Sequence, residues 1–74
     1  MVKVRVREKA LLQILAERNM SQNGLARSAG LTSGHVSQLI RGTRYVAPRT
    51  RQRIIQALGD VPFDRIFSIH IKRH

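Results

Sequence analysis

The segment of residues 21–42 constrains the fold of this 74-residue chain more than any other part of the sequence. Apolar residues recur three and four positions apart in its first half and again in its second half, which is the spacing of two short helices. Ser21 and Thr32 stand where N-caps are favoured, Gly30 where a left-handed residue turns the chain, and Gly42 where the second helix would end. The segment therefore predicts two helices joined by a tight turn, a unit that can place its second helix in the major groove of DNA.

The same segment and the helix expected after it carry the pattern of a known family. The matching residues are Met20, Ser21, Gln22, Leu25, Ala26, Ala29, Gly30, Leu31, Val36, Ser37, Leu39 and Gly42, followed by Pro48, Thr50, Ile54, Ala57 and Leu58. Over residues 9–67 the chain resembles the Cro/C1-type helix-turn-helix family of phage and bacterial repressors and their relatives. The resemblance implies a mainly α, compact, lambda-repressor-like domain of four to five helices that binds double-stranded DNA.

The two ends of the chain follow a different periodicity. Residues 1–7 and 67–72 alternate apolar and polar side chains, which predicts a short strand at each end. Because a short strand is not stable alone, we expect the two to form a small two-stranded sheet, most simply antiparallel, either within one chain or between two. The sequence predicts one domain over residues 1–74, with its helical core at 9–67.

Further helices are expected on both sides of the central pair. Residues 8–19 have apolar side chains at helical spacing, and Asn19 is expected to end that helix. Pro48 suits the first turn of a later helix that stops at Gly59. Asp60 is then expected to cap a last short helical turn.

Composition supports a nucleic-acid partner. The chain has 14 Lys and Arg against 4 Asp and Glu, a net charge of +10. Neutralising phosphates releases condensed counterions, so a small chain this basic tends to bind polyanions. Charge alone would suit membranes or acidic proteins equally, and it is the motif that makes double-stranded DNA the expected partner.

Other classes of protein are disfavoured by what the sequence lacks. There is no cysteine, no signal-peptide pattern, no apolar run of about 18 residues and no phosphate-binding glycine loop. The histidines are not at metal-ligand spacing, so we expect neither an enzyme nor a metal or cofactor. The expected setting is the cytoplasm of a bacterium or a phage-infected cell, in association with the nucleoid.

The resemblance implies which residues read bases. In this family the first turn of the second motif helix faces base edges, which implicates Thr32, Ser33, Gly34, His35, Ser37 and Gln38. Gln38 is the best candidate, because a carboxamide donates and accepts at once and so pairs with adenine. Gly34 offers no side chain, so discrimination there should be weaker. For His35, an exposed polar residue without a base contact is an equal alternative.

Phosphate contacts are expected from the start of the first motif helix and from the basic loop after the second. The residues implicated are Gln22, Arg27, Arg41, Thr43, Arg44, Tyr45 and Arg49. For each arginine, a solvated surface side chain is a close alternative. Lys3, Arg5 and Arg7 form a positive row on the first strand, for which protection of a sheet edge is slightly favoured over a DNA contact.

The C-terminal segment offers residues for a core or for a dimer interface. They are Phe63, Ile66, Phe67, Ile69 and Ile71. A dimer would read an inverted repeat with half-sites about 10 base pairs apart. The expected function is a sequence-specific transcriptional regulator, a repressor of phage or bacterial type. Two alternatives stay open. The first is an antitoxin or other protein-interaction module with a DNA-binding motif, whose protein partner would bind the terminal strands or Phe63–Phe67. The second is a sequence-independent nucleic-acid binder.

Overall fold

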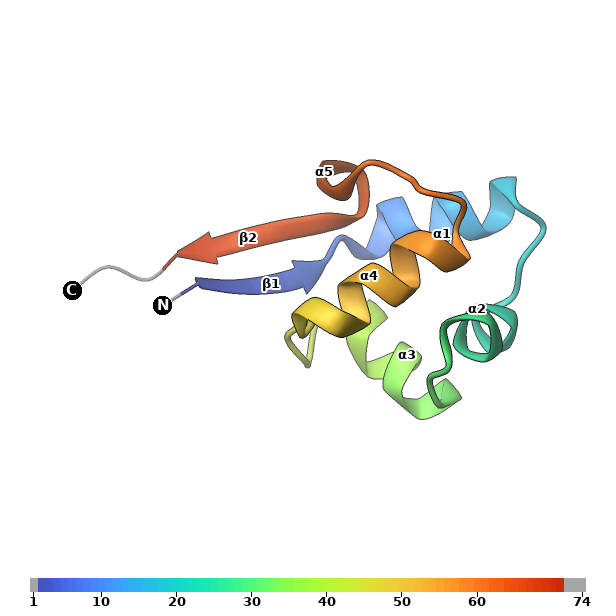
Figure 1. Ribbon diagram of the computed structural model, residues 1–74, viewed down its shortest axis with the longest axis horizontal. Coiled ribbons are helices and arrows are strands. Elements are labelled where there is room, and N and C mark those ends of the chain that lie inside the picture. Colours follow the sequence, from blue (N-terminus) through green and yellow to red (C-terminus); the bar gives the residue numbers. More distant parts are fainter. Residues whose placement is uncertain (1, 72–74) are drawn as a thin grey trace.

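The computed structural model describes residues 2–71, which form five helices and a two-stranded sheet (Figure 1). The elements follow in the order β1 (Val2–Val6), α1 (Glu8–Glu17), α2 (Gln22–Ala29), α3 (Ser33–Ile40), α4 (Pro48–Ala57), α5 (Phe63–Ile66) and β2 (Phe67–Ile71). The predicted mainly α architecture, with a sheet made by the two chain ends, is confirmed. Lys72, the last residue of the predicted C-terminal strand, lies outside the described residues. Within residues 2–71, no helix combines the length and the apolar character needed to cross a membrane.

The two chain ends pair within one molecule. β1 and β2 run antiparallel, with Val2, Val4 and Val6 opposite Ile71, Ile69 and Phe67. Because side chains alternate between the two faces of a strand, these apolar residues share one face of the sheet. The sequence left open whether the strands pair within one chain or between two, and the structure shows the first arrangement.

The apolar face of the sheet is covered only at its inner end. There it packs on the helices, and Val4 and Phe67 are buried. Figure 1 shows the sheet extending away from the helices toward its outer end. The side chains exposed at that end are Val2 (62%), Ile69 (53%) and Ile71 (63%). The sheet therefore carries an uncovered apolar patch beyond the helical body.

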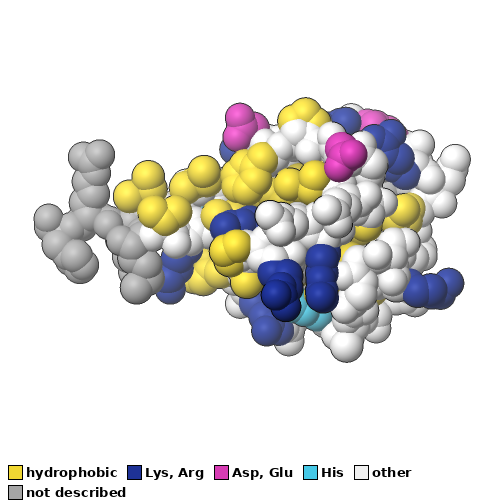
Figure 2. Space-filling view, in the orientation of Figure 1, with side chains coloured by type: hydrophobic (Ala, Val, Ile, Leu, Met, Phe, Trp, Pro, Cys, Tyr) yellow, Lys and Arg dark blue, Asp and Glu magenta, His cyan; other side chains and the backbone are white. Residues whose placement is uncertain are grey.

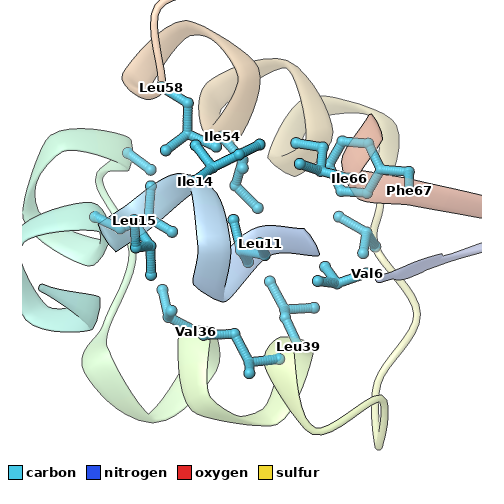
Figure 3. Packing of buried hydrophobic residues seen from close by; sticks show 14 of the residues in the cluster. Val6, Leu11, Ile14, Leu15, Val36, Leu39, Ile54, Leu58, Ile66 and Phe67 are labelled. Carbon is cyan, nitrogen blue, oxygen red and sulfur yellow. The ribbon is translucent and has the colours of Figure 1, made fainter. Parts of the chain in front are cut away.

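A cluster of buried apolar side chains joins all seven elements. Figure 3 shows Leu11 and Ile14 of α1 at its centre, between the labelled residues of α3 and those of α4. Ile14 is completely buried, and Leu11 is 1% exposed. On α1, α2 and α3, residues three and four apart supply the cluster, as the apolar spacing of the sequence predicts.

Helices α1 to α4 all end in the same hydrogen-bond motif. Each is followed by a residue with a left-handed backbone, namely Asn19 (φ 53°), Gly30 (φ 69°), Gly42 (φ 73°) and Gly59 (φ 81°). The N–H of the next residue then reaches back across the last turn; Leu31 N, for example, donates to Ala26 O at 2.8 Å. This arrangement satisfies carbonyls that a helix end leaves unpaired. The predicted helix ends at Asn19 and at the glycines are confirmed.

The predicted role of Asp60 as an N-cap is wrong. Asp60 has a left-handed backbone (φ 58°), and the N-cap of α5 is Pro62, which makes no side-chain cap bond. Instead, Asp60 N donates to Ile55 O at 2.9 Å, and Gly59 N donates to Gln56 O at 3.1 Å. The backbone of Asp60 is therefore engaged in closing α4, which removes this residue from the start of α5.

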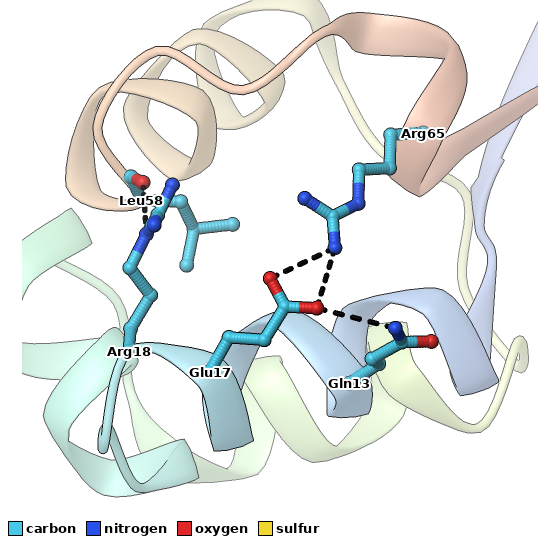
Figure 4. A network of polar contacts seen from close by, with 5 residues as sticks. All are labelled: Gln13, Glu17, Arg18, Leu58 and Arg65. Atoms are coloured by element: carbon cyan, nitrogen blue, oxygen red, sulfur yellow. Dashed lines mark hydrogen bonds and ion pairs between the residues drawn. The ribbon is translucent and has the colours of Figure 1, made fainter.

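Polar contacts tie α1 to the C-terminal elements on the side of the molecule away from α3 (Figure 4). Arg65 Nη2 of α5 lies 2.7 Å from Glu17 Oε2, and Gln13 Nε2 donates to the same carboxylate at 3.1 Å. The Arg65 hydrogen bond lowers the pKa of the Glu17 carboxyl below its ordinary value. Arg18 Nε donates to Leu58 O at 3.0 Å. Arg65 and Arg18 therefore make contacts within the protein on this side of the molecule.

Candidate nucleic-acid interface

Helix α3 turns one side to the core and the other to solvent. Its buried residues are Val36, Leu39 and Ile40. Of the predicted base-reading residues, Thr32, Ser33, Gly34 and Gln38 are exposed, and His35 and Ser37 are partly buried. The structure therefore brings these six residues together at the cap and on the outward side of one helix. A helix that is anchored on one side and open on the other can enter the major groove.

The start of α3 is fixed by the cap that the sequence predicts. Thr32 Oγ1 accepts a hydrogen bond from the backbone N–H of His35 at 3.1 Å. This use of the oxygen leaves the hydroxyl hydrogen for another acceptor. In the same way, Ser21 Oγ caps α2 by accepting from Gly24 N at 2.9 Å. Both predicted N-caps are confirmed.

The electrostatic state of His35 follows from its surroundings. Burial lowers the pKa of His35 below its ordinary value, and the positive charge of Arg44 lowers this pKa further. The imidazole is therefore neutral at neutral pH. A neutral ring has one donor and one acceptor nitrogen, which suits a base edge better than electrostatic attraction to phosphate.

Gln38 is held by the loop that follows α3. Arg44 Nη1 donates to Gln38 Oε1 at 3.2 Å. The bond occupies one lone pair of this oxygen and orients the amide, so that its two N–H groups and the second lone pair remain for a base. Thr43 also closes the helix end, since its hydroxyl donates to Gln38 O at 3.1 Å. Arg44 is therefore placed as a positioning residue for Gln38 as well as a cation beside it.

The side of the molecule that carries α3 is basic, and the opposite side carries acids. Residues 18–59 contain seven arginines and no Asp or Glu. Figure 2 shows Lys and Arg side chains gathered beside a histidine on the lower side, where α3 lies in Figure 1, and acidic side chains on the upper side. This separation gives the α3 side a positive potential that favours approach of a polyanion.

The helix-turn-helix family model matches residues 11–66, which run from α1 through α5. The chain belongs to this Cro/C1-type helix-turn-helix family. A search of curated proteins gave no match. The family consists of DNA-binding regulators that are generally not enzymes. The two helices that the sequence predicts within residues 21–42 are α2 and α3.

In this Cro/C1-type domain, the remaining residues predicted to contact phosphate lie on α2, at the end of α3 and on α4. Gln22 is exposed at the first position of α2, beside the first-turn N–H groups that a helix cannot pair internally. Arg41 is exposed at the end of α3, where its Nη2 donates to Ser37 Oγ at 2.9 Å. Arg27 in the last turn of α2 and Arg49 in the first turn of α4 are also exposed. These positions leave each side chain accessible to a phosphate.

The residues suggested for a core or a dimer interface divide between the two roles. Ile66 and Phe67 are 0% and 1% exposed in the single chain, so they are core residues and not part of an accessible interface. Phe63 is partly buried, with its ring centroid 5.1 Å from that of Phe67. Ile69 and Ile71 are accessible on the outer half of the sheet.

The sequence does not indicate that β1 lies beside the loop after α3. The alternation of residues 2–7 predicts a row of positive side chains on one face of the strand. The location of that row depends on contacts between residues about 40 positions apart, such as the hydrogen bond from Arg5 to Tyr45. The one relevant feature that the sequence does predict is the pairing of the two chain ends, which joins β1 to β2.

Proposed function

We propose that the protein is a sequence-specific regulator of transcription that binds double-stranded DNA and acts as a repressor of phage or bacterial type. In this proposal α3 enters the major groove, and Gln38 reads a base with Ser33 and Ser37 beside it. The residues assigned to phosphate are Gln22, Arg27, Arg41, Thr43, Arg44, Tyr45 and Arg49. The observation that carries the proposal is the outward side of α3, on which Gln38 is oriented by Arg44.

Occlusion of polymerase is the simplest mechanism of repression for such a domain. The proposed setting is the cytoplasm, on chromosomal or phage DNA. This part of the proposal rests on the family.

The proposal includes a homodimer that reads an inverted repeat. The exposed apolar face formed by Val2, Ile69 and Ile71 supports it, because side chains of this kind in one patch favour burial against a second surface. The alternative is a protein partner on the same patch, as in an antitoxin. Sedimentation of the purified protein separates the two: a dimer without any other protein supports self-association, and a monomer contradicts it.

Selection from a pool of random duplexes at about 0.15 M salt, followed by sequencing of the bound fraction, tests the function. Enrichment of an inverted repeat is the expected result and would give the operator. Enrichment of one half-site would support base reading and contradict the dimer. Binding without enrichment would contradict sequence-specific regulation and support the sequence-independent alternative.

A further inference from the structure

Two cations of β1 are fixed against the loop that follows α3. Lys3 Nζ lies 4.5 Å from the centre of the Tyr45 ring, and Arg5 Cζ lies 4.7 Å from it. Arg5 Nη2 also donates to the Tyr45 hydroxyl at 3.0 Å. The backbones are joined as well, because Val46 N donates to Val4 O at 2.8 Å. The strand is therefore held beside this loop by its side chains and by its backbone.

The chain itself connects these contacts to α3. Tyr45 follows Arg44, whose guanidinium donates to Gln38. Lys3, Arg5, Tyr45, Arg44 and Gln38 thus form one row across three elements, which we call the β1–loop–α3 strip. Because Val4 between the two cations is buried, Lys3 and Arg5 lie on the opposite face of the strand, away from the core.

The charge of the strip at β1 is not neutralised by its strand partner. The residues opposite Lys3 and Arg5 are His70 and Ser68, and neither is an acid. Stacking on Tyr45 restricts the two long side chains before any ligand binds, so less conformational entropy remains to be lost on binding. A preorganised pair of cations of this kind is suited to phosphate oxygens.

We propose that Lys3 and Arg5 bind the sugar–phosphate backbone of the duplex that receives α3, outside the major groove itself. The inference rests on the proposed function, because it takes the position of the duplex from α3. It extends the DNA-binding surface from the helix-turn-helix to the sheet. The contact is to phosphate, so it adds affinity without adding base preference.

Protection of a sheet edge accounts less well for these two residues. The backbone of β1 at Val4 already accepts a bond from Val46, so this edge is partly closed. Protection of an edge alone does not account for the convergence of both cations on a ring of the basic loop. The structure therefore favours the reading that the sequence alone ranked second.

The test compares Lys3→Gln/Arg5→Gln with Lys9→Gln/Arg65→Gln, which removes the same charge from α1 and α5. Binding to a duplex of about 30 base pairs of random sequence is measured between about 50 and 200 mM salt. Loss of two phosphate contacts should lower the slope of log K against log salt by about 1.8, so that the wild type loses about 12-fold more affinity over this range than the variant. The control variant should keep a slope close to that of the wild type. Equal slopes for the two double variants would overturn the proposal.

Two further measurements keep the result unambiguous. Circular dichroism establishes that each variant is folded; if the double variant is not, Lys3→Gln replaces it, with an expected slope decrease of about 0.9. Selection from random duplexes with the Lys3→Gln/Arg5→Gln variant should return the same site as the wild type. A changed site would also contradict a pure phosphate contact. Because the salt slope is measured on random sequence, failure of the strip is distinguishable from failure of base reading by α3.

Discussion

The contact between Arg44 and Gln38 allows the proposed reading surface to be tested by a double-mutant cycle. Arg44 Nη1 lies 3.2 Å from Gln38 Oε1, and both side chains are exposed. A hydrogen bond to a charged group contributes about 1.5–3 kcal/mol to stability, but solvent at an exposed site reduces this to about 0.5–1 kcal/mol. The structure thus predicts a small but measurable coupling between the two residues.

The two substitutions should have different effects on binding. Gln38→Ala should reduce preference for one base pair by about 1–3 kcal/mol, or about 5- to 150-fold. Arg44→Ala should weaken binding to all duplexes and lower the salt slope by about 0.9. It should also reduce preference at the Gln38 base pair by about two- to fivefold, because the amide is no longer oriented.

The assay is a fluorescence anisotropy titration of the selected duplex and of the same duplex with one base pair replaced. In the Gln38→Ala background, Arg44→Ala should change affinity but not preference. Arg49→Ala is the matched control, since Arg49 is an exposed arginine on α4 and should change affinity alone. If Arg44→Ala leaves the preference of the wild-type background unchanged, the positioning role of Arg44 is refuted.

Three further predictions concern stability. Ile14→Ala, at a fully buried position, should lower the free energy of unfolding by about 2–5 kcal/mol in urea denaturation; a loss below that range would contradict its place in the core. Gly30→Ala should destabilise the protein by about 1–2 kcal/mol, because φ at this position is 69°. Gly34→Ala should stabilise α3 by about 1 kcal/mol, because no atom lies within 4 Å of the new Cβ. Equal effects of the two substitutions in thermal melts would refute this contrast. The pKa of His35 is lower in the folded protein than in the unfolded chain, where it is near 6.5. The stability that results from this difference is fully present above pH 6.5, and it is lost as the pH falls through the folded-state pKa. Melting temperature should therefore fall more steeply on acidification in the wild type than in His35→Gln, and parallel curves would contradict the lowered pKa.

Local chemistry accounts for the parts of the fold that the sequence predicts. The caps at Ser21 and Thr32 and the turn at Gly30 depend on residues within a few positions, so residue type and spacing are sufficient. Asp60 shows the limit of this reasoning. An Asp between two helices suits either a cap or a left-handed turn, and hydrogen bonds back into α4 determine the outcome.

Tertiary contacts account for what the sequence does not predict. Pairing of the chain ends within one molecule depends on where the helices place them, and that placement also makes Phe67 a core residue. The contact of Arg5 with Tyr45 likewise joins residues far apart in the chain. The sequence shows the row of positive side chains on β1, but it does not show that Tyr45 and the loop after α3 lie beside that row.

Methylation interference on the selected duplex tests the central claim, that α3 reads bases in the major groove. Dimethyl sulfate modifies guanine N7 in the major groove and adenine N3 in the minor groove, and the two grooves present different groups to a protein. The account predicts that methylation of guanine N7 within each half-site blocks binding, and that methylation of adenine N3 in the minor groove there does not. Interference confined to minor-groove adenines, or none at all, would contradict reading of the major groove by α3.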